Sequence, residues 1–286
     1  MTNNEIRDEV KRLNPETFVR LHEQLFYKCQ TLSSKTVLYH YTNLNALVDG
    51  IIVDKPNSGE EICLWVSRYT HLNDPTEIEN GINSIKAFAP EPVTDMLQEI
   101  LVKNHVLSFS TARDFLGMWK MYGDNCSGVM LGFDTKVMQS RFGGLLQPCM
   151  YADSKYEKDV YHRLMNCELD QVFKNLSHTQ QLFMLASLSL VYVTIRKNNH
   201  YKSENEVRVV GIGCPHLDGD ADCFYRVARG KIVPYVKVYL PKSALQSVWL
   251  GPRINSKQSI SDLTEMLISR GFNDVKVLCS KIPYRE

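Results

Sequence analysis

The chain of 286 residues lacks a large net charge, closely paired cysteines and a long apolar run. Its 33 basic and 32 acidic side chains leave a formal charge of +1, which excludes a global attraction to nucleic acid or a membrane. The eight cysteines are scattered without a CxxC pair, so no disulfide framework is indicated. The most apolar stretch, Leu182 to Val193, is too short and too interrupted by serines to span a bilayer.

The N-terminal sequence MTNNEIRDEVKRL is polar and lacks the apolar region of a secretory signal. Together with the scattered cysteines, it leads us to expect a reduced, cytoplasmic protein with no membrane partner.

Several motifs that would identify a cofactor are also absent. The sequence has no GxxxxGK[ST] phosphate loop, no GxGxxG, no HExxH and no GxSxG. Residues 214–223 bring two cysteines, a histidine and three aspartates together, and the acids alternate as in a calcium loop. Cys223, however, stands where the turn glycine of such a loop belongs, and Arg229 stands where its glutamate belongs. We therefore expect no metal, and a polar hairpin loop is the simpler interpretation.

The order of apolar patterns predicts an α+β fold. Residues 1–32 have a helical pattern and form a predicted N-terminal arm. Short β-type runs then alternate with helices of unequal length, and residues 155–193 make up the longest helical block. There is no internal repeat and no linker. The simplest organisation is a single mixed-sheet domain over 33–286, with a helical insert near 155–193. The strands are expected at 37–41, 63–67, 106–110, 128–133, 207–212, 232–240, 248–250 and 275–279, and the other helices at 44–50, 75–87, 92–103 and 261–270.

A first polar cluster, Tyr39-His40-Tyr41-Thr42, lies at the end of the first predicted strand. Strand alternation directs His40 to the face opposite Tyr39 and Tyr41. Two interpretations of His40 remain open, a histidine satisfied within the core and a functional group at a cleft edge.

The second cluster follows the strand at 106–110. Ser108 and Ser110 are two residues apart and share one strand face, where their hydroxyls can hold a polar ligand or a carboxylate. Trp119 and Tyr122 are three apart on a predicted helix and share a face. That pair is explained either by core packing or by stacking on a ligand ring.

The third cluster is Glu204-Asn205-Glu206-Val207-Arg208, in which the ionisable residues alternate. The alternation predicts that two carboxylates and a guanidinium share one strand face. One interpretation is a solvated edge strand with an internal ion pair. In the functional interpretation a glutamate is the charged group of a site, and Arg208 or Lys202 holds it in place. Glu206 is preferred to Glu204, because it lies nearer the strand proper.

A fourth polar segment, Leu72 to Glu77, is typical of a helix start. Asp74 caps the helix, Pro75 occupies the first turn, and Glu77 completes a capping-box arrangement. This explanation needs no catalytic role.

Six segments in this order resemble a bacterial family of unknown function, family 2971. They are LYHYTNLNALVDGI, LWVSRYTHLNDPTE, LSFSTARDFLGMWKMYGDNCSGVMLGF, YKSENEVRVV, VWLGP and SKIPYR. The resemblance runs from about Val37 to Arg285. The first segment is also similar to the opening of ADP-ribosyltransferases that act as toxins or modify DNA.

The similarity to transferases implies an ADP-ribosyltransferase superfold, NAD as substrate and no metal. It implies that His40, Glu206 and Glu204 form the catalytic set. It further implies a macromolecular acceptor, either protein or nucleic acid, and a role as a toxin or phage-defence effector that a regulatory protein controls. The expected NAD-binding residues are Tyr41, Thr42, Ser108, Ser110, Tyr122 and Arg208.

Two other functions remain open from the residues alone. A non-enzymatic nucleotide- or nucleic-acid-binding module would hold phosphate through His40, Ser110, Lys202 and Arg208. The basic run Arg196-Lys197-Asn198-Asn199-His200-Tyr201-Lys202, with Arg226, Arg229 and Lys231 further on, would supply cationic groups and an aromatic ring. A metal-independent nuclease would use His40 and Glu206 as an acid–base pair.

Overall fold

The structure is a computed structural model. It describes residues 9, 12–26, 32–33, 36–52, 62–74, 76–169, 171–213, 222–228, 230–254 and 256–284. Most of the 214–223 loop and much of the predicted N-terminal arm therefore lie outside the described residues.

The described chain is a mixture of helices and strands, as the α+β prediction requires. The strands are β1 (Val37–Thr42), β2 (Ile62–Arg68), β3 (His105–Ser110), β4 (Val129–Asp134), β5 (Leu146–Pro148), β6 (Met150–Tyr151), β7 (Arg196–Lys197), β8 (Glu206–Ile212), β9 (Phe224–Ala228), β10 (Lys231–Leu240), β11 (Leu245–Leu250) and β12 (Lys276–Cys279). The α-helices are α2 (Pro15–Leu25), α3 (Glu77–Lys86), α4 (Glu91–Lys103), α5 (Leu116–Met121), α6 (Thr135–Phe142), α7 (Lys155–Met165), α8 (Gln171–Lys174), α9 (His178–Ile195) and α10 (Lys257–Ser269).

Ten of the strands form one mixed sheet that branches at β3. The main order is β12-β11-β4-β1-β3-β2-β10-β9, and β8 with β5 joins the other edge of β3. Strands β1 and β2 share the remaining edge of β3. There, β1 pairs with β3 only at Ser110, and β2 pairs with β3 only at His105 and Val106. Residues 107–109 therefore border neither strand, and the sheet is open at this point.

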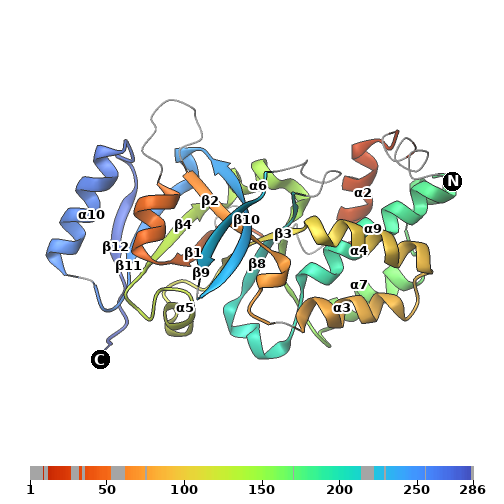
Figure 1. Cartoon of the computed structure of the whole chain (residues 1–286), viewed down its shortest axis with the longest axis horizontal. Coiled ribbons are helices and arrows are strands. Elements are labelled where there is room, and N and C mark those ends of the chain that lie inside the picture. The colour runs from red at the N-terminus through yellow and green to blue at the C-terminus, as the bar shows by residue number, and fades with distance from the viewer. Residues whose placement is uncertain are drawn as a thin grey trace.

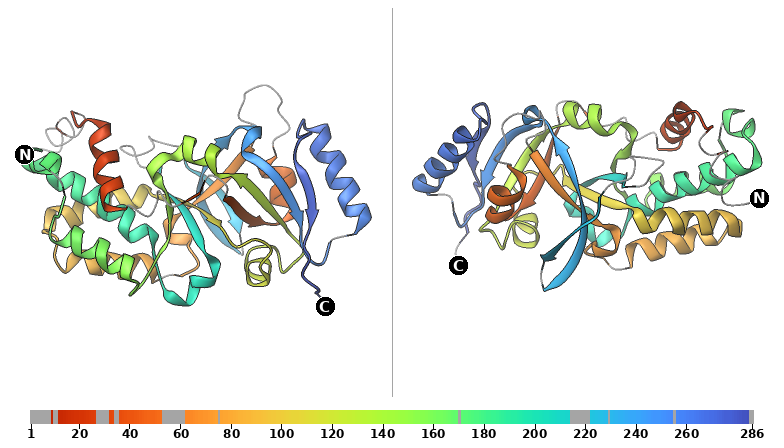
Figure 2. Two further views of the ribbon diagram at one scale, coloured as in Figure 1. Left: turned by 180° about the vertical axis from the view of Figure 1, so that it is seen from behind. Right: turned by 45° about the horizontal axis from the view of Figure 1, so that its top comes forward.

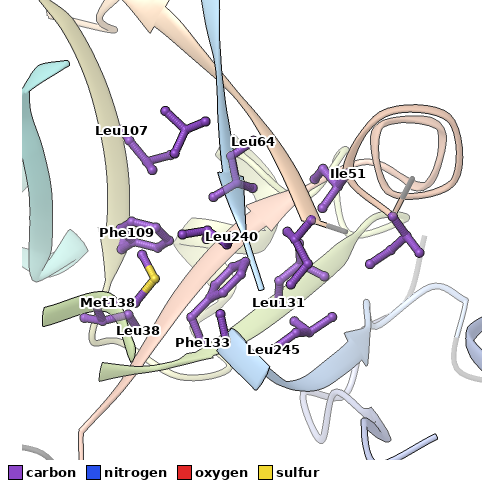
Figure 3. Packing of buried hydrophobic residues seen from close by; sticks show 14 of the residues in the cluster. Leu38, Ile51, Leu64, Leu107, Phe109, Leu131, Phe133, Met138, Leu240 and Leu245 are labelled. Carbon is purple, nitrogen blue, oxygen red and sulfur yellow. The ribbon is translucent and has the colours of Figure 1, made fainter. Parts of the chain in front are cut away.

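The two halves of the branched sheet pack on each other through a continuous apolar cluster. Leu64 and Leu240, from β2 and β10, meet Leu131 and Phe133 from β4, with Phe109 of β3 between them (Figure 3). Alternation explains this, because every second residue of each strand points to the same face. The predicted strands are thus confirmed, with ends within a few residues of the observed ones, and most of them carry the core, whereas β12 is only partly buried.

A second core lies among the helices. Helices α2, α3, α4, α7 and α9 gather at one end of the molecule and are called the helical layer below, and α10 lies at the opposite end (Figures 1 and 2). Helix α9 is capped by a Ser177–Gln180 capping box and is buried over most of its length. The insert predicted near 155–193 is confirmed as helical, and α3 and α4 join it. Among the described residues, no helix is long and apolar enough to cross a bilayer.

Several elements differ from the sequence predictions. The helix expected at 44–50 is a π-helical turn, η2 (Ala46–Ile51). The predicted elements do not include helix α6 or the edge strand β9. Helix α6 is short and is stabilised by Asp134, whose carboxylate caps the amide of Lys136 at 2.7 Å. The part of the predicted arm that is described, α2, packs on the helical core through Leu21, Leu25 and Phe26.

The packing of α2 buries His22 between the rings of Phe18 and Phe26. Burial lowers the pKa of His22 from 6.5 to about 4. The unfolded chain therefore binds a proton that the folded chain does not, and stability should decrease as the pH falls from about 6.5 to 4. The free energy of unfolding should fall by about 3 kcal/mol in total over this range. Urea denaturation across this range should show a smaller loss for His22→Gln than for wild type. An identical pH dependence in the two proteins would contradict this account.

Candidate functional site

The opening at β3 forms one wall of a cavity of about 280 Å³. Residues from β1, β2, β3, β8, β9 and the helical layer line it, so segments far apart in the sequence meet there. Eight of the nine predicted site residues line this cavity, and the exception is Ser110. The eight are His40, Tyr41, Thr42, Ser108, Tyr122, Glu204, Glu206 and Arg208.

His40 closes the gap that the branched sheet leaves. Its Nδ1 donates a hydrogen bond to the Ser108 carbonyl at 3.0 Å, and its ring meets Phe109 edge-on. Burial lowers the pKa of His40, and the positive charge of Arg226 lowers it further against the effect of the Ser108 bond. The imidazole is therefore neutral near pH 7, and Nε2 is its acceptor nitrogen.

Glu206 is held by two cations. Its carboxylate receives a bidentate pair from Arg208, with Nε at 2.9 Å and Nη2 at 3.0 Å, and also binds Lys197. Burial raises the pKa of Glu206, but Arg208 and Lys197 outweigh it and lower the pKa to about 2. Glu206 is thus a fixed anion at every physiological pH.

Glu204 completes the acidic side of the cavity. Lys197 donates to its Oε2 at 2.5 Å, and the Tyr122 hydroxyl donates to its Oε1 at 2.8 Å. Asn73 donates in turn to the Tyr122 hydroxyl at 2.6 Å. Burial lowers the pKa of Lys197, but the charge of Glu206 outweighs it, so this pKa is raised. Lys197 therefore stays charged between the two carboxylates.

Glu204 and Glu206 converge for a reason that alternation alone does not supply. Glu204 lies in the 3-10 turn η5 (Asn199–Glu204) rather than on β8. Asn205 between them has φ 43 and ψ 51, a left-handed conformation that asparagine adopts more readily than most residues. The prediction of a shared face is confirmed, but for Glu204 the turn is responsible. The solvated edge strand is wrong, because all of β8 is buried.

The predicted role of Arg208 is confirmed in part. Arg208 holds Glu206, as the functional interpretation expected, but Lys202 is exposed and Lys197 takes the place predicted for it. Arg208 is only 2% exposed, and its Nη1 binds Glu77 and the Thr194 carbonyl. Its donors are used within the protein, so a direct contact between Arg208 and NAD is not supported.

Ser110 and Tyr41 also have structural partners. The Ser110 hydroxyl donates to the Glu204 carbonyl at 2.5 Å and accepts from the Ala112 amide, which fixes the turn before β8. Tyr41 packs edge-on against Trp119 and donates to the Ala112 carbonyl. The ring of Tyr41 therefore belongs to a packed aromatic cluster, although the residue also lines the cavity.

Sequence reasoning missed two members of the charged cluster. Glu77, expected in a capping box, is buried and pairs with Arg208 instead, and burial raises its pKa in spite of that partner. The observed cap at this helix start is Asp74, which accepts from the Thr76 amide at 2.9 Å. Lys197 belongs to a basic run and gives no local signal. Both are placed by packing between the helical layer and β8.

A metal site finds no support in the part of the chain that the structure describes. No group of three or more histidine, cysteine, aspartate or glutamate side chains there is arranged to hold an ion. Of the acidic loop at 214–223, only Asp222 and Cys223 are described.

The stability of the charged cluster depends on Arg208. Arg208→Met should lower the free energy of unfolding by about 3–5 kcal/mol, because Glu77 would lose its cationic partner while buried and Glu206 would keep only Lys197. Urea denaturation at neutral pH measures this loss. The matched control is Lys202→Met, an exposed cation six residues away, which should change stability by about 0.5 kcal/mol at most. Equal stability of the two variants would contradict the account.

Comparison with known proteins gives one match. No curated protein and no solved structure matches the chain. The matched segment, residues 118–209, runs from α5 to β8 and contains Tyr122, Lys197, Glu204, Glu206 and Arg208. This segment matches the family described as "Protein of unknown function (DUF2971)", which is the family that the motifs predicted.

Proposed function

We propose that this protein cleaves the bond between nicotinamide and ribose in NAD and transfers ADP-ribose to a macromolecular acceptor or to water. One observation supports the proposal above all. A single cavity is lined by neutral His40 on one side and by the fixed carboxylates of Glu204 and Glu206 on the other.

The chemistry suits these groups. When the glycosidic bond breaks, nicotinamide leaves as a neutral ring with the bonding electron pair, and positive charge develops on the ribose. The acceptor then bonds to that ribose carbon and loses a proton. No general acid is needed for this leaving group. A carboxylate that is already ionised and fixed stabilises the developing charge without rearranging.

Glu206 is the group we assign to this role. Its Oε1 accepts from Arg208 Nε, which leaves a second lone pair for the ribose 2′-hydroxyl. The surrounding cluster has three carboxylates, Glu77, Glu204 and Glu206, and two cations, Lys197 and Arg208. Its formal charge is therefore −1 when all five groups are ionised. Tyr122 lines the cavity, and its hydroxyl donates to Glu204, so we place its ring beside the nicotinamide.

The size of the cavity suggests how NAD would lie. A volume of about 280 Å³ is at the lower end of ligand pockets, which span about 300–1,000 Å³. We expect the nicotinamide riboside half to be enclosed and the adenosine to extend outside. A toxin or phage-defence role in the cytoplasm, with a regulatory partner, would accord with this activity and rests on the family resemblance alone.

The two alternatives receive less support. The binding module needs Ser110 and Arg208 to face a phosphate, but both are hydrogen-bonded within the protein. The nuclease needs an acid–base pair that exchanges protons near neutral pH. The pKa of Glu206 is about 2, and burial lowers that of His40, so neither group is suited to that task.

Nicotinamide release from NAD by the purified protein tests the proposal. Glu206→Gln should lower the rate about 100-fold or more, because it removes the charge while keeping the shape of the side chain. His40→Asn, whose amide can still donate to the Ser108 carbonyl, should also lower it. The matched control is Glu79→Gln, the same substitution on the exposed face of α3, which should leave the rate unchanged.

Circular dichroism should establish that each variant is folded before rates are compared. The absence of nicotinamide release by wild type, with and without cell extract to supply an acceptor, would overturn the proposal. Full activity of folded Glu206→Gln would remove Glu206 from the mechanism.

A further inference from the structure

Arg226 on β9 is a cation of the cavity that the charged cluster does not use. It lines the cavity, and its Nη2 donates to the Ser67 hydroxyl at 3.0 Å. Its Nε is buried and has no hydrogen-bond partner among the residues that the structure describes. None of the salt bridges among the described residues involves Arg226. A buried guanidinium nitrogen without a partner destabilises a protein, which calls for an explanation.

The strands hold this guanidinium in a fixed place. Arg226 lies opposite Val233 on β10, and Tyr235 of β10 lies opposite Ser67 of β2, so the side chains share one face of the β9-β10-β2 ribbon. The Arg226 side chain crosses β10 to reach Ser67. Its Cζ is 5.8 Å from the ring centroids of both Trp65 and Tyr235, which stack on each other. The aromatic pair orients the guanidinium while its Nε lacks a partner.

The position of Arg226 in the cavity also matters. Its charge lowers the pKa of His40, and Arg226 lines the same cavity as the carboxylates of Glu204 and Glu206. An anionic group of a ligand is repelled by the acidic side and attracted to Arg226. The cavity is thus polarised, with an anion site at β9 and a site for developing positive charge at β8.

We propose that Arg226, supported by Ser67, binds the diphosphate of the nucleotide held in this cavity. The guanidinium has five donors in a planar fork that matches phosphate oxygens. The identity of the nucleotide rests on the proposed function. The binding of a phosphate-bearing ligand at Arg226 does not, so the two can be tested separately.

Isothermal titration with ADP-ribose and with inorganic pyrophosphate tests this site. Arg226→Met keeps the apolar stem on the rings and removes the donors. It should weaken ADP-ribose binding about 10- to 100-fold and reduce the dependence of binding on salt. Nicotinamide riboside, which lacks the diphosphate, should bind both proteins equally. Lys231→Met, an exposed cation of the same hairpin, is the matched control and should bind like wild type.

A second readout separates a binding role from a structural one. Without ligand, Arg226→Met should be at least as stable to urea as wild type, because it removes an unpaired buried donor and its charge. A residue that served only the fold would be expected to lose stability on replacement. Lower stability with unchanged ADP-ribose binding would overturn the proposal.

The remaining outcomes are also decisive. ADP-ribose binding that depends on Arg226, without nicotinamide release by wild type, would support the anion site and remove the proposed catalysis. If wild type releases nicotinamide and Arg226→Met binds ADP-ribose as tightly as wild type does, the proposed catalysis would be supported and the anion site overturned. Wild type that binds neither ADP-ribose nor pyrophosphate would overturn the anion site.

Discussion

A buried ionic cluster joins the helical layer of this protein to its sheet. Arg208 on β8 reaches Glu77 on α3 and the carbonyl of Thr194 on α9, while Lys197 on β7 binds Glu206 at the start of β8. Each charge would be costly in the interior on its own, and only the mutual pairing offsets that cost. The helical layer therefore cannot move from the sheet without exposing or unpairing these groups. The same pairing lowers the pKa of Glu206 and keeps its carboxylate ionised beside the cavity.

The branch of the sheet at β3 is the second constraint, and it makes the cavity. Because β1 and β2 pair with opposite ends of one edge of β3, the backbone between those ends has no strand beside it on that edge, while β8 pairs with the other edge. The His40 ring satisfies the exposed Ser108 carbonyl. A fold-level feature thus fixes the position of a residue that the sequence singled out. The cavity is then lined by the neutral imidazole of His40, by the carboxylates of Glu204 and Glu206, and by the guanidinium of Arg226 from β9.

The sequence predicts what short-range periodicity determines. Alternation in the β-type runs identifies the strands β1, β2, β3, β4 and β8 that carry the core, and it places Glu206 and Arg208 on one face. It cannot assign the observed contacts of Lys197, Glu77 and Arg226, because these contacts join elements far apart in the chain. Tyr41 shows how packing limits such a prediction. It lines the cavity as His40 does, but neighbours on a strand point to opposite faces, and the Tyr41 ring packs against Trp119.

The most direct measurement is a crystal structure of Glu206→Gln with NAD, since the slowed variant should retain intact ligand. The account predicts the nicotinamide riboside within the cavity between β1 and β2, its ribose beside residue 206, and the diphosphate within hydrogen-bond distance of Arg226. NAD bound elsewhere on the molecule, or a cavity that stays empty at saturating NAD, would contradict it.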